Sequence, residues 1–316
     1  MLRLLALALC LSSVVHAQMF AHLDDISNSL KVNRGYIVAW EVGSNAQHVA
    51  DQIRIYDKRG TPVTRISMLP LVPEATSMDI NDVAIGPTGV IVVAATYSAG
   101  PGTLPSSVLL YFDLHGQLQS AVALLPWRQI AKLVVDEESN VWTLTESTTG
   151  KDPSTVPMLV EYDSTGKIVR ELLKRSQFPA DADILHSDIG MVGFGYVNGA
   201  VWFWTPASQD LVTVDIHNGS FKKVHTGMPN QSPAETAMGT HRDGDSLVSL
   251  ILGAPKLYSP GTWGIFRWSP TQGWSKIEPV ECQKQKTLLR DMDNGKGIFA
   301  RSTQDRGMDV CISDFQ

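Results

Sequence analysis

The feature that most constrains the fold is a hairpin pattern that recurs along the chain. In "LVEYDSTGKIVREL" (159–172), an alternating strand leads into a tight turn with Gly and leaves on a second strand. Similar hairpins occur at 53–66, 109–122, 211–224 and 264–277. The same turn position is held by Asp57, Asp113, Asp163, Asp215, Ser269 and Asp314. Self-similarity with a period of roughly 40 to 50 residues indicates a propeller or a solenoid.

A second kind of hairpin precedes each of these. It pairs a short apolar strand with a stronger one across a Gly, Asn or Asp turn, at 28–42, 82–96, 132–146, 191–205, 237–251 and 287–301. Each unit therefore has four antiparallel strands, and no helical periodicity of useful length interrupts them. Four-stranded sheets repeated about an axis form a propeller, which leaves few exposed edges. The sequence predicts an all-β, six-bladed propeller.

The sixth unit lacks a fourth strand. Its first hairpin is at 287–301 and its third strand at 308–314. An unpaired edge strand favours aggregation, so a ring of blades has to close. Residues 18–26 ("QMFAHLDDI") precede the first blade and are free to supply the missing outer strand. We expect the strand at 18–26 to pair with 308–314 and complete the sixth blade.

The first seventeen residues have the pattern of a cleavable export signal. Arg3 precedes an apolar run from Leu4 to Leu11, and small residues, Val15 and Ala17, occupy the positions required for a cut after Ala17. The apolar run is too short to span a bilayer, and no other stretch is a transmembrane candidate. We expect a signal peptide at 1–17, a single propeller domain at 18–316, and a secreted or periplasmic protein.

Cleavage of this segment would remove Cys10 and leave Cys282 and Cys311. In an oxidising compartment two cysteines allow only one disulfide, Cys282 with Cys311. The alternative is two separate buried thiols. No CxxC motif is present, so the cysteines do not indicate a zinc or redox site.

Two segments resemble a known family of propellers. "DVAIGPTGVIVVA" (82–94) and "VVDEESNVWTL" (134–144) are similar to the strand, Gly- or Asp-containing turn, strand signature of NHL-like repeats, and a "YDxxG" hairpin follows. The resemblance covers nearly the whole chain after the signal and implies a six-bladed propeller of the TolB-like superfamily. Members of that superfamily bind RNA, proteins or sugars, or hydrolyse lactones, so the resemblance implies no single activity.

The charge of the chain and the motifs it contains limit the classes of function that it can have. The chain has 26 Lys and Arg against 32 Asp and Glu, a net charge of −6, without a basic patch. This argues against nucleic acid or an anionic membrane surface as a partner. HExxH, GxSxG, P-loop and GxGxxG motifs are all missing from the sequence. We therefore favour a non-enzymatic binding protein without a cofactor.

The lengths of the connections point to one functional face. Turns between the first and second strands and between the third and fourth are short, whereas the other connections are long and varied. Binding groups concentrate on long loops held by a rigid scaffold. Tyr97, Trp127, Tyr258 and Trp263 lie in or beside these loops and are candidates to line a sugar or peptide groove; the alternative is packing against a neighbouring blade. His186, in an acidic run at 181–188, is a candidate base or simply part of a solvated loop.

A calcium site is the remaining hypothesis. Asp79, Asn81 and Asp82 lie where the innermost strand of the second blade begins, and their oxygens suit Ca²⁺; turn capping is the alternative. The favoured function is a monomeric scaffold that binds a protein, peptide or carbohydrate through the loop-rich face. The alternative is a Ca²⁺-dependent hydrolase of lactonase type at the channel mouth.

Overall fold

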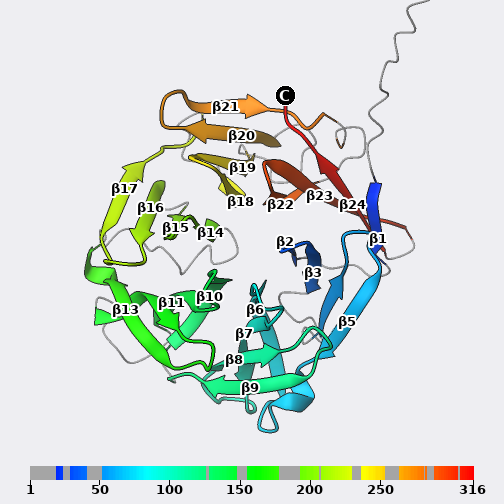
Figure 1. Cartoon of the computed structure of the whole chain (residues 1–316), viewed down its shortest axis with the longest axis vertical. Helices are drawn as coiled ribbons and strands as arrows, with labels where there is room; N and C mark the ends of the chain where they lie inside the picture. Colours follow the sequence, from blue (N-terminus) through cyan, green and yellow to red (C-terminus); the bar gives the residue numbers. More distant parts are fainter. Residues whose placement is uncertain are drawn as a thin grey trace, which may run out of the picture.

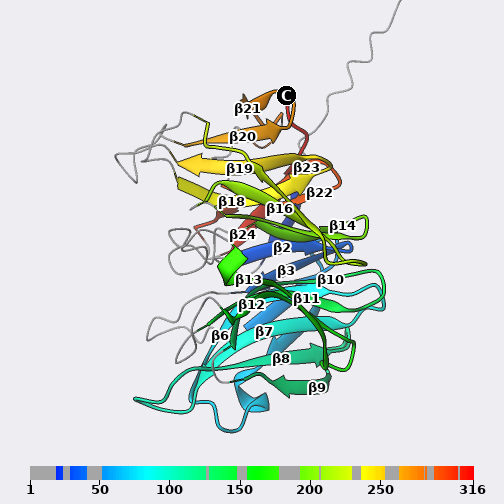
Figure 2. The same cartoon turned by 90° about the vertical axis from the view of Figure 1, so that its left-hand side faces the viewer.

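The computed structural model describes residues 19–23, 29–40, 52–125, 128–147, 155–177, 193–205, 208–229, 236–252, 263–280, 282, 288–304 and 307–316. In this part of the chain, six four-stranded antiparallel sheets surround one axis as blades (Figure 1). Figure 2 shows the ring from the side, with the strands running between its two faces. The all-β six-bladed propeller predicted from the repeats is confirmed.

The strands of each blade follow one another from the axis outward, except that the outermost strand of blade 6 is the first strand of the chain. Blade 1 consists of β2 (Ser29–Asn33), β3 (Tyr36–Trp40), β4 (Gln52–Tyr56) and β5 (Pro62–Ser67). Blade 2 consists of β6 (Ser77–Ile85), β7 (Ile91–Ser98), β8 (Ser106–Phe112) and β9 (Leu118–Ala123). Blade 3 consists of β10 (Arg128–Val135), β11 (Val141–Ser147), β12 (Pro157–Tyr162) and β13 (Ile168–Lys174). Blade 4 consists of β14 (Gly193–Val197), β15 (Ala200–Thr205), β16 (Asp210–Asp215) and β17 (Phe221–His225). Blade 5 consists of β18 (Thr236–Asp243), β19 (Ser246–Leu252), β20 (Trp263–Ser269) and β21 (Gly273–Ile277). Blade 6 consists of β22 (Leu288–Asp293), β23 (Lys296–Ser302), β24 (Met308–Ser313) and β1 (Met19–Leu23). The described connections include the short 3₁₀ helices η1 (Leu69–Leu71) and η3 (Arg175–Gln177).

The repeated Asp residues build the outer hairpins. Oδ1 of Asp57 accepts hydrogen bonds from the backbone N–H groups of Arg59 at 2.8 Å and Thr61 at 2.9 Å, and Gly60 takes a φ of +79° that a residue with a Cβ rarely adopts. These backbone donors hold the pKa of Asp57 below its ordinary value. The same carboxylate-to-backbone pattern recurs at Asp113, Asp163 and Asp215.

The core lies between the blades. Among the described residues, six clusters of buried apolar side chains each fill one interface between neighbouring blades. Alternation along β3 produces this division: Val38 and Trp40 face blade 2, whereas Ile37 and Ala39 face blade 6. Middle strands such as β8 and β12 are buried on both faces, whereas outermost strands such as β9 and β17 are largely exposed.

The strand β1 closes the ring beside β24 (Figure 1). Ala21 pairs with Val310 and Leu23 with Met308, and Leu23 is fully buried between blades 6 and 1. The His22 imidazole lies 2.9 Å from the Asp309 carboxylate. The predicted closure by an N-terminal strand is thus present, over Met19–Leu23; residues 24–28 lie outside the described part of the chain.

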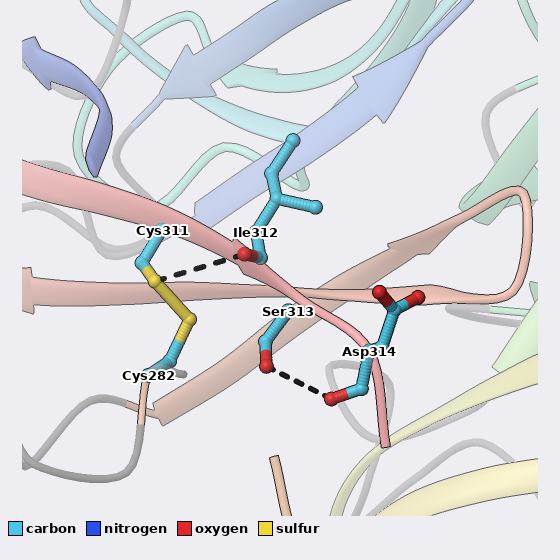
Figure 3. Close-up of a disulfide and its surroundings, with 5 residues drawn as sticks. All are labelled: Cys282, Cys311, Ile312, Ser313 and Asp314. Atoms are coloured by element: carbon cyan, nitrogen blue, oxygen red, sulfur yellow. Dashed lines mark hydrogen bonds between the residues drawn. A yellow bond between two sulfur atoms is a disulfide. The ribbon is translucent and has the colours of Figure 1, made fainter. Parts of the chain in front are cut away.

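A disulfide joins Cys282 to Cys311 of β24, the pairing predicted from the sequence (Figure 3). Their Cα atoms are 6.1 Å apart, within the range that a disulfide spans. Both cysteines are buried in the cluster between blades 5 and 6, together with Leu289 and Phe299. The bond links the last strand of the chain to the segment that enters blade 6.

The two faces of the ring differ in the length of their connections. The turns from first to second and from third to fourth strand have two to five residues within each blade, such as 34–35 in blade 1 and 86–90 in blade 2. Connections at the opposite face are longer on the whole, for example 68–76 between blades 1 and 2. The unequal faces expected from the sequence are therefore found. No helix among the described residues is long and apolar enough to cross a membrane.

Candidate functional site

The six innermost strands surround the axis of the ring (Figure 1). Residues of these strands and Trp40 of β3 line a cavity there, which we call the axial cavity. Its volume is about 180 Å³, and every blade contributes at least one residue to its wall. Phe194 and Trp40 supply apolar surface, and Gly239 and Thr240 supply small residues. The charged or titratable residues of the wall are Lys31 on β2, Asp82 on β6, Lys132 on β10, His241 on β18, and Arg290 and Asp291 on β22.

Irregular pairing turns several of these side chains toward the axis. In β6 the register shifts between Ile80 and Asp82, which makes Asn81 an extra residue relative to β7. Such a β-bulge bends a strand and changes the direction of the side chains beside it. The register of β10, β18 and β22 shifts at the corresponding place. The first paired residue after the shift lines the axial cavity in all four of these strands, as Asp82, Lys132, Thr240 and Asp291.

Asp82 ties the first three blades together at the cavity wall. Its carboxylate accepts hydrogen bonds from the backbone N–H of Val83 at 2.9 Å and from the N–H of Leu133, in the next blade, at 2.9 Å. The Lys31 ammonium lies 3.2 Å from Oδ2 and also donates to the Leu133 carbonyl oxygen. An innermost strand is a sheet edge, whose N–H groups need acceptors. Asp82 supplies one, so its oxygens have structural partners.

Asp291 performs the same task between blades 6 and 1. It accepts hydrogen bonds from its neighbour Met292 N–H at 2.8 Å and from Val32 N–H of the next blade at 2.6 Å. The remaining contact is with Nδ1 of His241, 3.1 Å from Oδ1. A carboxylate on one ring nitrogen orients the imidazole, which leaves Nε2 as the other functional atom. A Cβ added at Gly239 would lie 3.6 Å from this Nε2.

Lys132 occupies the position that holds an aspartate in blades 2 and 6, but its chemistry is opposite. Its side chain is half-buried, and it makes no hydrogen bond or ion pair with a residue that the structure describes. Burial lowers the pKa of its ammonium; the nearby carboxylates of Asp82 and Asp291 act in the other direction, and Lys31 adds to the lowering. The charge of Lys132 therefore forms no contact with the described residues that would stabilise the fold.

The balance of charge in the axial cavity is positive. Three cationic side chains, Lys31, Lys132 and Arg290, face two carboxylates, Asp82 and Asp291. Each carboxylate is already engaged by backbone N–H groups and by a side chain. Burial also lowers the pKa of the Arg290 guanidinium. The cavity therefore offers donors and positive charge to whatever enters it.

Of the aromatic and His candidates from the sequence, only Tyr97 has a described side chain, and it does not line the axial cavity. Tyr97 lies at the end of β7, half-buried, and its hydroxyl donates to Glu74 at 2.9 Å; burial, and then Glu74, raise its pKa. Trp263 begins β20, where it pairs with Leu252. Trp127, His186 and Tyr258 lie outside the described residues. Their role on the loop-rich face stays a prediction.

The metal candidates Asp79, Asn81 and Asp82 all lie on β6. The Asn81 amide donates to Thr96 Oγ1 and to the Ile130 carbonyl, both at 2.8 Å, and Asp82 has the partners given above. Oδ1 of Asp79 is buried and accepts no hydrogen bond from a described residue. In the described part of the chain, no three His, Cys, Asp or Glu side chains form a group suited to a metal ion.

Sequence reasoning missed Lys31, Lys132, His241, Arg290 and Asp291. A signal was available, since a charged residue interrupts an apolar innermost strand in several units, as in "IAKLVV" (130–135) and "LLRDMD" (288–293). Aligning the first hairpins of the units places each of these residues within one position of another in the middle of an innermost strand. Such an alignment does not show which of these side chains face one another across the axis, because that depends on the register shifts in the innermost strands.

Comparison with known proteins supports the fold. No family model matches the chain, and no curated protein matches it. A solved structure from Bacteroides fragilis, described as a candidate exported protein, is similar with a TM-score of 0.55 at 9% identity, over 92% of this chain and 90% of that one. A luciferin-regenerating enzyme is similar with a TM-score of 0.52 at 10% identity, over 93% of this chain and 92% of that one. At these identities the likeness is one of fold, the β-propeller.

Proposed function

We propose that this protein is an exported binding scaffold that takes a small polar ligand, or the polar end of a protein, peptide or carbohydrate, into its axial cavity. The observation that carries the proposal is the convergence of ionisable side chains from five blades on one cavity. Asp82 and Asp291 are paired and join blades, but the Lys132 side chain has no partner among the described residues, and an unpaired charge inside a fold costs stability. A concave site with a few convergent polar groups and a shifted pKa is the usual place for a ligand.

The size of the cavity limits what can enter. A volume of about 180 Å³ has room for several water molecules or a group of comparable size. Drug-sized ligands usually occupy roughly 300 to 1,000 Å³. The ligand is therefore small, or only its end enters while the rest contacts the long connections. In the second case Tyr97, Trp127, His186, Tyr258 and Trp263 are the candidate contacts outside the cavity.

Export and family membership belong to the same proposal. The signal-like segment 1–17 and the disulfide between Cys282 and Cys311 both fit an oxidising compartment outside the cytoplasm. The NHL-like repeats favour membership of the TolB-like superfamily. Amino-terminal sequencing of the protein recovered after expression with its full leader tests the first point. A mature chain that begins at Gln18 is expected, and retention of residues 1–17 would contradict it.

The test of the cavity uses two substitutions at Gly239. A Cβ there meets only His241 Nε2, at an ordinary contact distance of 3.6 Å, so Gly239→Ala should fit and serve as the control. Gly239→Leu adds a branched side chain that fills the cavity without changing its charges. Saturation-transfer NMR with acetate, glucuronate, glucose and glycerol as probes should detect binding of at least one to the wild type. Gly239→Leu should abolish that signal, and Gly239→Ala should retain it.

Two results would count against an axial binding site. One is no saturation transfer to any of the four probes in the wild type. The other is a signal of equal strength in Gly239→Leu, which would place the bound probe elsewhere on the protein. Circular dichroism and melting of both variants, recorded in parallel, separate loss of binding from loss of fold.

The alternative is a Ca²⁺-dependent hydrolase with Asp79, Asn81 and Asp82 as ligands. The buried Oδ1 of Asp79 is the feature that favours it. Against it, a cation at Asp82 would compete with the Lys31 ammonium 3.2 Å away. A ligand that binds only the native state at a hundredfold excess over Kd stabilises it by about 2.7 kcal/mol. Melting in millimolar Ca²⁺ and in chelator tests this alternative, which requires a clear upward shift with Ca²⁺.

A further inference from the structure

We propose that the axial cavity is a site for a carboxylate anion, with Lys132 as the charged group that holds it. The inference rests on the proposed function and adds the chemical class of the ligand. It is argued from the equivalent positions in three blades, from the balance of charge, and from the size of the cavity.

The first argument is positional. Asp82, Lys132 and Asp291 each follow the register shift of an innermost strand. The two aspartates accept the N–H group of the next blade, Leu133 and Val32 respectively, and so help to join neighbouring blades. A lysine has no acceptor and cannot replace them in that role. Lys132 therefore occupies a position at which the other two blades accept an N–H group from their neighbour, but its side chain cannot accept one.

The second argument concerns charge. The oxygens of Asp82 are occupied by Lys31 and by two backbone N–H groups, and those of Asp291 by His241 and two others. Lys132 has no hydrogen bond or ion pair with the described residues, although it lines the same cavity. A half-buried ammonium without a partner loses hydration that no protein group replaces. The lowered pKa of Lys132 is the sign of that loss, and a bound anion would reverse it.

The third argument selects a monoanion. Asp82 pairs with Lys31 and Asp291 with His241, which leaves Lys132 as a cation without a counter-ion among the described residues, so a single negative charge would balance it. A dianion of the same size would bring excess negative charge near Asp82 and Asp291. A carboxylate is small enough for a cavity of about 180 Å³ and has two oxygens for donors on different strands. Arg290 of β22 lies in the same wall as Lys132.

A carboxylate of this kind has two plausible sources, a sugar acid and the C-terminus of a peptide. The experiment measures binding of glucuronate and of N-acetyl-Gly-Gly by calorimetry at constant ionic strength near pH 7. Glucose and the amide of N-acetyl-Gly-Gly are the neutral counterparts. We expect at least one acid to bind, and to bind at least tenfold more tightly than its neutral counterpart. Which acid binds more tightly identifies the source.

Two lysine substitutions connect the result to the site. Lys132→Met keeps the length and apolar stem of the side chain but removes the charge, and should weaken binding of the acid at least tenfold. Lys222→Met makes the same change on the exposed outer strand β17 and should leave the affinity unchanged. In the wild type the affinity should also fall at alkaline pH, as Lys132 loses its proton beside Lys31, Asp82, Asp291, His241 and Arg290.

The outcomes separate this inference from the proposed function. Equal affinity for an acid in wild type and Lys132→Met overturns the assignment of Lys132. Binding of glucose or glycerol that Gly239→Leu abolishes, with no preference for an acid, overturns the anion site but leaves the axial cavity as a binding site. Binding of no probe at all overturns both. If Lys132→Met does not fold, the alkaline loss of affinity in the wild type decides, and a constant affinity up to pH 10 contradicts the inference.

Discussion

Removal of the disulfide should measure how strongly the last blade is tied into the ring. The change is the double substitution Cys282→Ala and Cys311→Ala, made in the exported chain. Both residues are buried between blades 5 and 6, and Cys311 lies in β24, which also carries the closing strand β1. Without the bond, the unfolded chain recovers the conformational freedom that the loop had removed.

The magnitude follows from the length of that loop. The two cysteines are 29 residues apart, for which the chain-entropy relation gives about 12 cal/mol/K, or about 3.6 kcal/mol at 25 °C. A domain of about 300 residues unfolds with an entropy of roughly 0.6 kcal/mol/K, so the melting temperature should fall by about 6 °C.

The assay is thermal melting of three samples: oxidised wild type, the double variant, and wild type with dithiothreitol. The double variant and the reduced wild type should have the same melting temperature, because both lack the disulfide. Amide hydrogen exchange should increase more in β1 and β24 than in β8, since the bond also restrains local opening of the strand to which β1 pairs. A double variant that melts within about 1 °C of the oxidised wild type would refute the reasoning.

Three further changes test the closure and the cavity. Leu23→Ala empties a fully buried site between blades 6 and 1 and should cost about 2 to 5 kcal/mol in urea unfolding, whereas an unchanged midpoint would show that β1 does not hold the ring. Asp82→Ala leaves the Lys31 ammonium and the Leu133 N–H without their acceptor and should cost about 3 to 5 kcal/mol; a loss under about 1 kcal/mol would contradict the bridging role. Because burial lowers the pKa of Lys132 in the folded state, the unfolded chain binds more protons between that lowered pKa and the ordinary value of 10.5, so stability should rise with pH across this window. Lys132→Met should lose this rise, and parallel pH profiles of the two proteins would contradict the shift.

The hairpin turns could be predicted because they are encoded locally. An Asp whose side chain accepts the N–H groups two and four residues later, followed by a Gly at positive φ, needs nothing from the rest of the chain. Asp57 illustrates this, and Asp113, Asp163 and Asp215 repeat it. The strand alternation, the number of blades and the fold class follow from the same local pattern.

The cavity residues could be predicted only in part. The sequence suggests Asn81 and Asp82 as metal ligands, but in the structure their side chains join blades: Asn81 donates to Ile130, and Asp82 accepts from Leu133. The sequence shows that these groups are polar and near the start of an innermost strand. It does not show that the backbone of the next blade is close enough to use them, since that depends on how two separate sheets pack.

The sequence by itself determined the repeat, the turns, the strand that closes the ring and the cysteine pair, because each depends on neighbouring residues or on the count of strands and thiols. Only the tertiary structure decided what the axis contains. A shift of one residue in β10 and β22 sets which side chains line the axial cavity, and the bond from Val32 N–H to Asp291 joins residues 259 positions apart. Side chains so distant in the sequence meet only when all six blades have packed. Lys132 is therefore recognised as a candidate binding residue from its neighbours in the ring and not from the sequence of its own strand.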